Sequence, residues 1–290
     1  MPRTDLIRSR LTIAALALVT ASSVAAAPRT GTIDLAAVWQ VGDNVSRAVR
    51  ADEMEEASRL RVELLGRRPS FAADGRGPSL EGHVGLEAVP DFVDLGRVDA
   101  GLRTRWTIAP GSGFGRTSLA LEAGITGLLH RDSAIRDGVL VDLGLVTGAR
   151  STDRVSWEGG YRFEVRRARR GDVWDMHTHR LFLHAEHHTS RTLALWARLG
   201  AATGDVVATG RPAQHILDNS AARIRDDAFE TGRIAYRLDG DEASVAVGAV
   251  WQPAAALGLE LAVTHRRVEA EGDLDYDATE ATASAVWRLQ

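Results

Sequence analysis

The segment spanning residues 155–165 alternates strictly between two kinds of side chain. Its odd-numbered positions carry Val, Trp, Gly, Tyr, Phe and Val, whereas the positions between them carry Ser, Glu, Gly, Arg and Glu. Because successive side chains of a β-strand point to opposite faces, this period of two gives the strand one apolar face and one polar face. The pattern recurs along almost the whole chain, which therefore consists of strands with hydrocarbon on one side and a polar environment on the other.

A secretory signal peptide is expected at the N-terminus, because the first residues have its three zones. Arginines come first, then an apolar run and then small residues. We expect cleavage after Ala25 or Ala26, so that residues 1–26 are removed and residues 27–290 form a single domain. No stretch approaches the roughly 20 consecutive apolar residues of a transmembrane helix, so any membrane insertion is expected to be by strands.

Including this segment, thirteen segments after the signal peptide alternate in the same way, and together they predict an all-β fold, an antiparallel transmembrane β-barrel. Their apolar face tolerates Gly, Ala and Thr and carries no charge in the central part of any segment, as lipid contact allows. A soluble β-sandwich also alternates, but its buried face is expected to be uniformly apolar, so the barrel is favoured. The segments span residues 32–40, 57–65, 79–89, 97–108, 117–129, 138–149, 154–166, 178–188, 191–201, 232–239, 243–252, 256–268 and 278–289.

The number of strands is expected to be even, as in bacterial single-chain barrels, so thirteen segments require one more or one fewer. Fourteen is the preferred number, and twelve is the alternative. A further strand is expected between residues 202 and 231, around 206–208 or 222–225. Short connections such as 150–153 and 189–190 are expected on the periplasmic side, and longer ones outside.

Tryptophan favours the membrane interface, and five of the seven tryptophans face outward in the predicted barrel. Four lie near periplasmic strand ends and the fifth lies near the opposite rim. We predict that these five mark the membrane interface: Trp106, Trp157, Trp251, Trp287 and Trp39. Trp196 points inward and is a candidate plug of the lumen.

Over residues 30–290 this architecture resembles outer-membrane β-barrel proteins of the monomeric porin or channel type. The terminal strand also carries the resemblance, since Ala285, Trp287 and Leu289 keep the alternation, although the chain ends in Gln290 where such barrels usually have an aromatic residue. The resemblance implies a location in the outer membrane of a Gram-negative bacterium. It also implies membrane lipid, lipopolysaccharide and the barrel assembly machinery as partners.

The inward faces carry nearly balanced acidic and basic residues, and all the basic ones are arginine because the chain contains no lysine. Such residues either brace the interior as ion pairs or line a constriction. Arg233 and Arg237 are expected to point inward as well. The residues predicted to line the pore are Arg103, Arg105, Glu122, Glu158, Arg162, Glu164, Arg166, Arg198, Glu260, Arg266 and Arg288.

The predicted function is the passive passage of small polar or charged solutes, because a fourteen-stranded barrel is wide enough for a channel if little fills it. The alternative is a non-conducting structural, adhesion or assembly barrel whose segment 202–231 meets a partner. An outer-membrane hydrolase is less favoured. His188 and Ser190 lie on a predicted periplasmic turn, no hydrolase motif surrounds them, and we assign no catalytic residue.

Other features of the sequence constrain the function less. The net charge of −4 argues against nucleic-acid binding, and the absence of cysteine excludes a disulfide framework. His177 and His179 share one strand face and are weak candidates for Zn²⁺ or Cu²⁺ ligands, but no complete metal site and no cofactor is predicted. The arginine-rich run 166–170 is a candidate for attracting anionic solutes or lipopolysaccharide phosphates. The sequence makes no prediction of the oligomeric state.

Overall fold

The computed structural model describes residues 31–48, 50, 53–69, 77–109, 115–226, 228–229 and 232–289, so the predicted signal peptide lies outside the described residues. No helix in this part of the chain is both long and apolar enough to span a membrane. The helical elements are η1 (Val93–Leu95) and α2 (Gln214–Asn219). The strands are β1 (Thr32–Gly42), β2 (Ala57–Arg68), β3 (Gly77–Ala88), β4 (Arg97–Ala109), β5 (Thr117–His130), β6 (Gly138–Arg150), β7 (Val155–Ala168), β8 (Met176–His188), β9 (Leu193–Gly210), β10 (Ala222–Arg225), β11 (Ile234–Ala254), β12 (Leu257–Ala270) and β13 (Leu274–Arg288).

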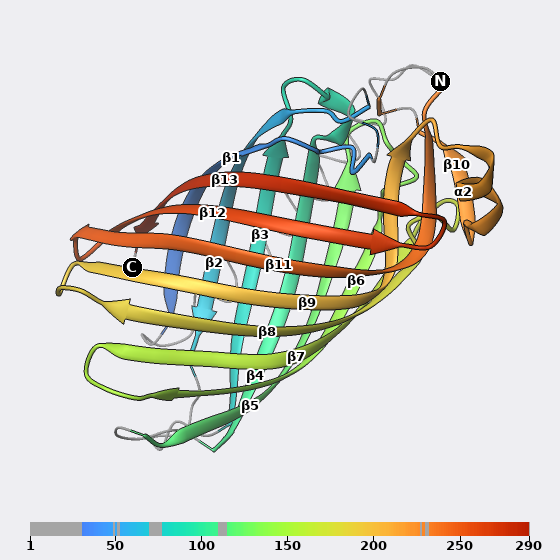
Figure 1. Cartoon of the computed structure of the whole chain (residues 1–290). Coiled ribbons are helices and arrows are strands. Elements are labelled where there is room, and N and C mark those ends of the chain that lie inside the picture. The colour runs from blue at the N-terminus through green and yellow to red at the C-terminus, as the bar shows by residue number, and fades with distance from the viewer. Residues whose placement is uncertain are drawn as a thin grey trace.

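Twelve of these strands close into an antiparallel barrel (Figure 1). β9 pairs with β11, and β13 pairs with β1, which completes the ring of hydrogen-bonded strands. The short β10 lies outside the ring and pairs only with the first four residues of β11. The all-β antiparallel barrel and the alternative of twelve strands are therefore confirmed, whereas the preferred number of fourteen is wrong.

The error arises in β11, a single strand of 21 residues that we predicted as two segments, 232–239 and 243–252. The Asp-Gly-Asp-Glu stretch at 239–242 interrupts the apolar alternation and resembles a turn, but the structure continues the ladder through it. A tilted strand needs only about 9–11 residues to cross a bilayer, so β11 is long enough to extend beyond the apolar band, where charge is tolerated. Residues 206–208 belong to β9, and 222–225 form β10 outside the barrel.

The two ends of the barrel differ in their connections. β1 begins and β13 ends at one end, called here the terminal end, where the connections 151–154, 189–192 and 255–256 are short. The opposite end, called here the loop end, carries the long connections 43–56 and 211–233. The short connections predicted for one side of the membrane thus lie together at the terminal end.

Large apolar side chains cover the outer surface of the barrel. Leu86, Trp106 and Leu261 are 60%, 58% and 66% exposed, and leucine, valine and isoleucine residues of other strands share this outward face. The inward positions of the same strands carry glycine, alanine and charged residues instead. An apolar surface of this extent marks contact with another phase, and its position around the barrel fits a lipid bilayer.

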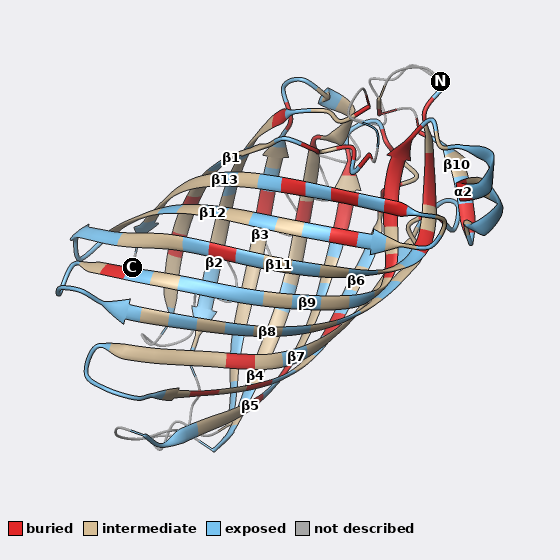
Figure 2. Cartoon of the chain, in the orientation of Figure 1, coloured by how far each residue is buried: buried red, intermediate tan, exposed pale blue. Residues whose placement is uncertain are grey.

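The main hydrophobic cluster lies at the loop end rather than in the middle of the barrel. Tyr236 and Leu238 of β11 pack there with Leu274 and Tyr276 of β13 and with Ile216 of α2. Buried residues accordingly gather in the loop-end parts of β9, β11 and β13 (Figure 2). Through Ile216, this cluster holds the connection 211–233 against the loop end of the barrel.

Replacing an outward leucine by arginine tests whether this surface meets hydrocarbon. We expect Leu261→Arg to lower the free energy of unfolding in lipid vesicles by about 2–4 kcal/mol, because a charged side chain near the bilayer midplane is poorly solvated. Leu289→Arg is the matched control at the terminal end, next to Trp287, where the expected loss is about 0–1 kcal/mol. Equally small losses for both variants, measured by denaturant titration, would show that the outer face is not in hydrocarbon.

Candidate functional site

The lumen of the barrel is the candidate site, because all the residues predicted to line a pore lie on inward faces. Their positions alternate with those of the exposed apolar residues on the same strands. They come from β4 (Arg103, Arg105), β5 (Glu122), β7 (Glu158, Arg162, Glu164, Arg166), β9 (Arg198), β12 (Glu260, Arg266) and β13 (Arg288).

The two further arginines expected to point inward are placed differently. Arg237 lies on the outward face of β11, the face that also carries Val245 and Val247, and its Nε lies 3.6 Å from Oδ1 of Asp205. Arg233 precedes β11 and is buried among the loops. Because we predicted β11 as two strands, the face of its first half was assigned separately, and a shift of one residue reverses inside and outside.

A branched ion-pair network runs along the inward face of β4, β5 and β7. Arg105 reaches Glu122 (Nη1 to Oε1, 3.3 Å) and Glu158 (Nη2 to Oε2, 3.0 Å). The second carboxylate oxygen of Glu122 accepts a hydrogen bond from Arg162 (Nη2 to Oε2, 3.0 Å). Glu122 therefore lies between two guanidinium groups, and this part of the inward charge braces the wall.

A second set of ion pairs lies closer to the loop end and uses inward glycines to make room. Arg61 holds Asp99 through two hydrogen bonds of 2.6 and 2.9 Å, from Nη1 to Oδ1 and from Nη2 to Oδ2. A Cβ added at Gly85 on the neighbouring strand would lie 2.3 Å from Nη2 of Arg61. Because Gly85 has no side chain, the long side chain of Arg61 can lie along the barrel wall instead of extending into the lumen.

Two aromatic side chains also lie in the lumen. The guanidinium carbon of Arg198 is 5.0 Å from the ring centroid of Phe182, and no ion pair of Arg198 is found among the described residues. The indole of Trp196 packs over Gly248, where an added Cβ would lie 2.6 Å from the ring, and beside His184. Trp196 points inward as predicted, but it lies along the wall rather than across the lumen.

Loops from opposite sides of the barrel meet over the lumen at the loop end. Arg136, between β5 and β6, forms a buried two-point ion pair with Asp226, which follows β10; its Nη1 lies 2.7 Å from Oδ1. Thr209 at the end of β9 donates its hydroxyl to the same carboxylate at 2.8 Å. Phe92 and Phe229 pack with ring centroids 5.0 Å apart. We call these joined connections the cap.

The connection 43–56 also belongs to the cap, because it reaches from β1 to the end of β9. The amide of Thr209 donates to the carbonyl oxygen of Ser46 (3.0 Å), and the amide of Arg211 donates to Oε2 of Glu53 (2.9 Å). Arg233 donates to the carbonyl oxygen of Glu53 (2.8 Å) and pairs with Glu55. Since β11, β12 and β13 separate β9 from β1 in the sheet, this connection spans that side of the barrel mouth.

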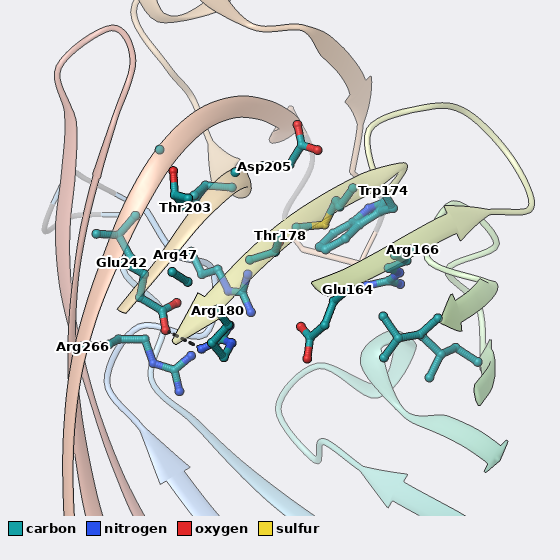
Figure 3. A pocket seen from close by; sticks show the side chains of 18 of the residues that line it. Arg47, Glu164, Arg166, Trp174, Thr178, Arg180, Thr203, Asp205, Glu242 and Arg266 are labelled. Atoms are coloured by element: carbon teal, nitrogen blue, oxygen red, sulfur yellow. Dashed lines mark hydrogen bonds and ion pairs between the residues drawn. The ribbon is translucent and has the colours of Figure 1, made fainter. Parts of the chain in front are cut away.

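A cavity of about 390 Å³ lies inside the barrel, lined by two loop residues and by the loop-end parts of strands around the ring (Figure 3). Glu164, Arg166 and Arg266 of the predicted set line it, together with Arg47 from the connection 43–56. Sequence reasoning missed Arg47 and the whole cap. In the cap, Arg136 lies 90 residues from Asp226 and Arg211 lies 158 residues from Glu53, and no periodic pattern marks such contacts.

The five tryptophans of the predicted interface all lie on the outward face. Trp106, Trp251 and Trp287 are 58%, 50% and 40% exposed near the terminal end, and Trp157 is partly buried there. Trp39 lies three residues from the loop end of β1 and is 50% exposed. Their depth in a bilayer stays a prediction.

The histidine pair lies on the outward face of β8 near the loop end, and each ring has a neighbour of its own. Nδ1 of His177 lies 2.6 Å from Oδ2 of Asp205, and Nδ1 of His179 lies 2.6 Å from the hydroxyl of Tyr161. The described residues contain no group of three or more histidines and carboxylates arranged to hold a metal ion.

Comparison with known proteins identifies the architecture but not a family. No protein-family model and no curated protein sequence matches the chain. Among solved structures, an outer-membrane channel from Pseudomonas putida F1 superposes with a TM-score of 0.58 at 11% identity, covering 91% of this chain and 97% of that one. The NanC porin (TM-score 0.47, 7% identity, 89% and 100% covered) and the translocator domain of the autotransporter NalP from Neisseria meningitidis (0.47, 11%, 99% and 96%) are less similar. The chain therefore has the fold of outer-membrane β-barrel channels.

Removing the shared carboxylate tests whether the network braces the wall. We expect Glu122→Gln to lower the free energy of unfolding by about 1–3 kcal/mol, because Arg105 and Arg162 both lose a charged partner in the lumen. Glu260→Gln is the matched control, since this inward carboxylate forms no ion pair with the residues that the structure describes, and a change of about 0–1 kcal/mol is expected. Unfolding is followed by heat-modifiable gel migration and denaturant titration. A control variant as unstable as Glu122→Gln would contradict the bracing role.

Proposed function

We propose that this protein is an outer-membrane channel that passes small polar or charged solutes passively. The observation that carries the proposal is the polar lumen, bordered by Arg103, Arg162, Glu158 and similar inward side chains, inside a barrel whose outer surface is apolar. A purely structural barrel has no need of glycines that keep charged side chains against the wall. The fold shared with a Pseudomonas putida channel supports the same function.

The inward charges divide into two groups in this proposal. Ion pairs such as Arg105 with Glu122 brace the wall and largely cancel each other's field. Arg198, stacked on Phe182 without a carboxylate partner among the described residues, carries a field into the lumen and contributes to ion selectivity. The cap forms the narrow part of the path at the loop end, so passage is restricted to small solutes.

A barrel that binds a partner without conducting is the second candidate function. The observation in its favour is the cap itself, because the buried ion pair of Arg136 with Asp226 fastens loops across the barrel mouth. In this case the segment 202–231 supplies the binding surface through α2 and β10. Location in the Gram-negative outer membrane, with lipid, lipopolysaccharide and the barrel assembly machinery as partners, is part of both proposals.

We do not propose an enzymatic function. The hydroxyl of Ser190 accepts hydrogen bonds from the amides of Thr192 (3.2 Å) and Leu193 (3.0 Å), as expected of a serine that stabilises a tight turn. His188 faces Glu186, with Nε2 lying 2.7 Å from Oε1. Both residues have a structural explanation at the terminal end of the barrel.

Planar bilayer recording tests the channel and the role of the cap together. We expect the purified protein to give reproducible conductance steps, and Asp226→Ala to increase their size, because it frees Arg136 and Thr209 and loosens the cap. Thr152→Ala, in a terminal-end turn remote from the cap, is the control and should leave the conductance unchanged. If neither the native protein nor Asp226→Ala conducts, the channel is excluded and the partner-binding barrel is favoured.

A further inference from the structure

The cavity beneath the cap is richer in positive than in negative charge. Among the described residues that line it are four carboxylates and six arginines: Arg47, Arg61, Arg97, Arg166, Arg180 and Arg266. One of the carboxylates, Asp205, is engaged by His177 (Nδ1 to Oδ2, 2.6 Å) and by Arg237 on the outward side. The cavity therefore presents more guanidinium groups than carboxylates that can neutralise them.

Four of the six arginines already have carboxylate partners. Arg61 holds Asp99, and Arg97 reaches Glu87 with an Nη2 to Oε2 distance of 3.1 Å. Arg180 pairs with Glu242 through Nη1 and Oε1 at 3.1 Å (Figure 3). Arg266 pairs with a further carboxylate that does not line the cavity, Glu280, at 2.6 Å. The unmatched positive charge is thereby confined to Arg47 and Arg166.

Arg166 is held in place without an ion pair to any of the described carboxylates. Its Nη2 donates to the carbonyl oxygen of Arg136 (2.6 Å), and its guanidinium lies over the ring of Trp174, 4.7 Å from the centroid. Its Nε is buried and has no hydrogen-bond partner among the described residues. Arg97, Arg136 and Arg47 are close enough to repel its charge, and the carboxylate of Asp137 attracts it without forming an ion pair with it. A guanidinium fixed among like charges, with a donor unused, is costly to bury unless an anion joins it.

Arg47 approaches from the cap. It has a left-handed backbone conformation, with φ of 57°, and its side chain extends toward the middle of the cavity (Figure 3). No ion pair of Arg47 is found in the described part of the chain. Among the described carboxylates that line the cavity, Glu164 is the one without an ion pair, and it lies on β7 two residues before Arg166. Among the described lining residues, one carboxylate and two guanidinium groups are without an ion pair, which leaves a net attraction for anions.

We propose that this cavity binds a small organic anion, with its carboxylate or phosphate oxygens on Arg47 and Arg166. Guanidinium groups present paired donors that match the geometry of an oxyanion, and they retain their charge at any physiological pH. Leu128, Leu140 and Val268 also line the cavity and offer an apolar surface to the body of the solute. The volume of about 390 Å³ suits a small molecule and not a polymer. The inference rests on the proposed function, since it names the solute class that the channel selects.

Calorimetric titration of the full mature protein in detergent tests the site without requiring conduction. Benzoate is the probe, and benzamide, which has nearly the same shape but no charge, is the matched control ligand. We expect benzoate to bind, benzamide not to bind, and inorganic phosphate to displace benzoate. Equal binding of benzoate and benzamide, no binding of benzoate, or no displacement by phosphate would overturn the oxyanion site.

Three variants and a control locate the site. Arg166→Gln and Arg47→Gln should each weaken benzoate binding about tenfold, the effect of one lost charged hydrogen bond. Glu164→Gln should instead strengthen binding, because it removes a like charge, and a damaged fold would not produce that gain. Arg154→Gln, in the turn 151–154 at the terminal end, should leave the affinity unchanged. Unchanged affinity in both Arg166→Gln and Arg47→Gln would overturn the assignment.

Failure of the anion site can be distinguished from failure of the proposed channel function. Benzoate binding by a protein that gives no conductance would exclude the channel and leave the anion site standing. Conductance without benzoate binding would leave the channel standing and exclude the anion site.

Discussion

Closure of the β-ladder is the constraint on which the rest of this structure depends. In hydrocarbon every unpaired backbone N–H or C=O group costs several kcal/mol, so a spanning sheet must have no free edge. The pairings of β13 with β1 and of β9 with β11 satisfy this requirement. Closure also divides the side chains into two environments. The outward positions face the lipid, and the charged side chains at the inward positions are confined to the lumen.

The arrangement of those enclosed charges follows from the limited room in a twelve-stranded barrel. Arginine is long, and inward glycines such as Gly85 and Gly124 let guanidinium and carboxylate groups lie along the wall. Along β4 to β7 the charges neutralise one another and stabilise the wall. Near the cap most charges are paired as well, but Arg47 and Arg166 form no ion pair with the described residues. Arg47 belongs to a loop, and Arg166 is held by a carbonyl oxygen and an indole. The same residue type thus serves as a brace in one part of the lumen and as a ligand-binding group in another.

Much of the fold was predictable from the sequence, because the two-residue alternation shows on which face of a strand each residue lies. The barrel, the inward charges and the outward Trp106 and Trp251 all follow from that period. The prediction failed at β11, where a charged stretch outside the apolar band resembles the sequence of a turn. The same error assigned Arg237 to the wrong face of the strand. The cap escaped prediction for a different reason. The pairing of Arg136 with Asp226 depends on how loops far apart in the sequence fold together. A local sequence pattern does not encode such an arrangement.

The most direct test of the account is the accessibility of neighbouring positions on one strand. The chain contains no cysteine, so single cysteines can be introduced at Val263, which faces outward on β12, and at the adjacent inward Thr264. Each variant is folded into lipid vesicles and exposed to a charged maleimide that does not cross membranes. The account predicts that Thr264→Cys reacts and Val263→Cys does not. Equal labelling of the two positions, or faster labelling of Val263→Cys, would contradict a polar lumen inside a lipid-facing barrel.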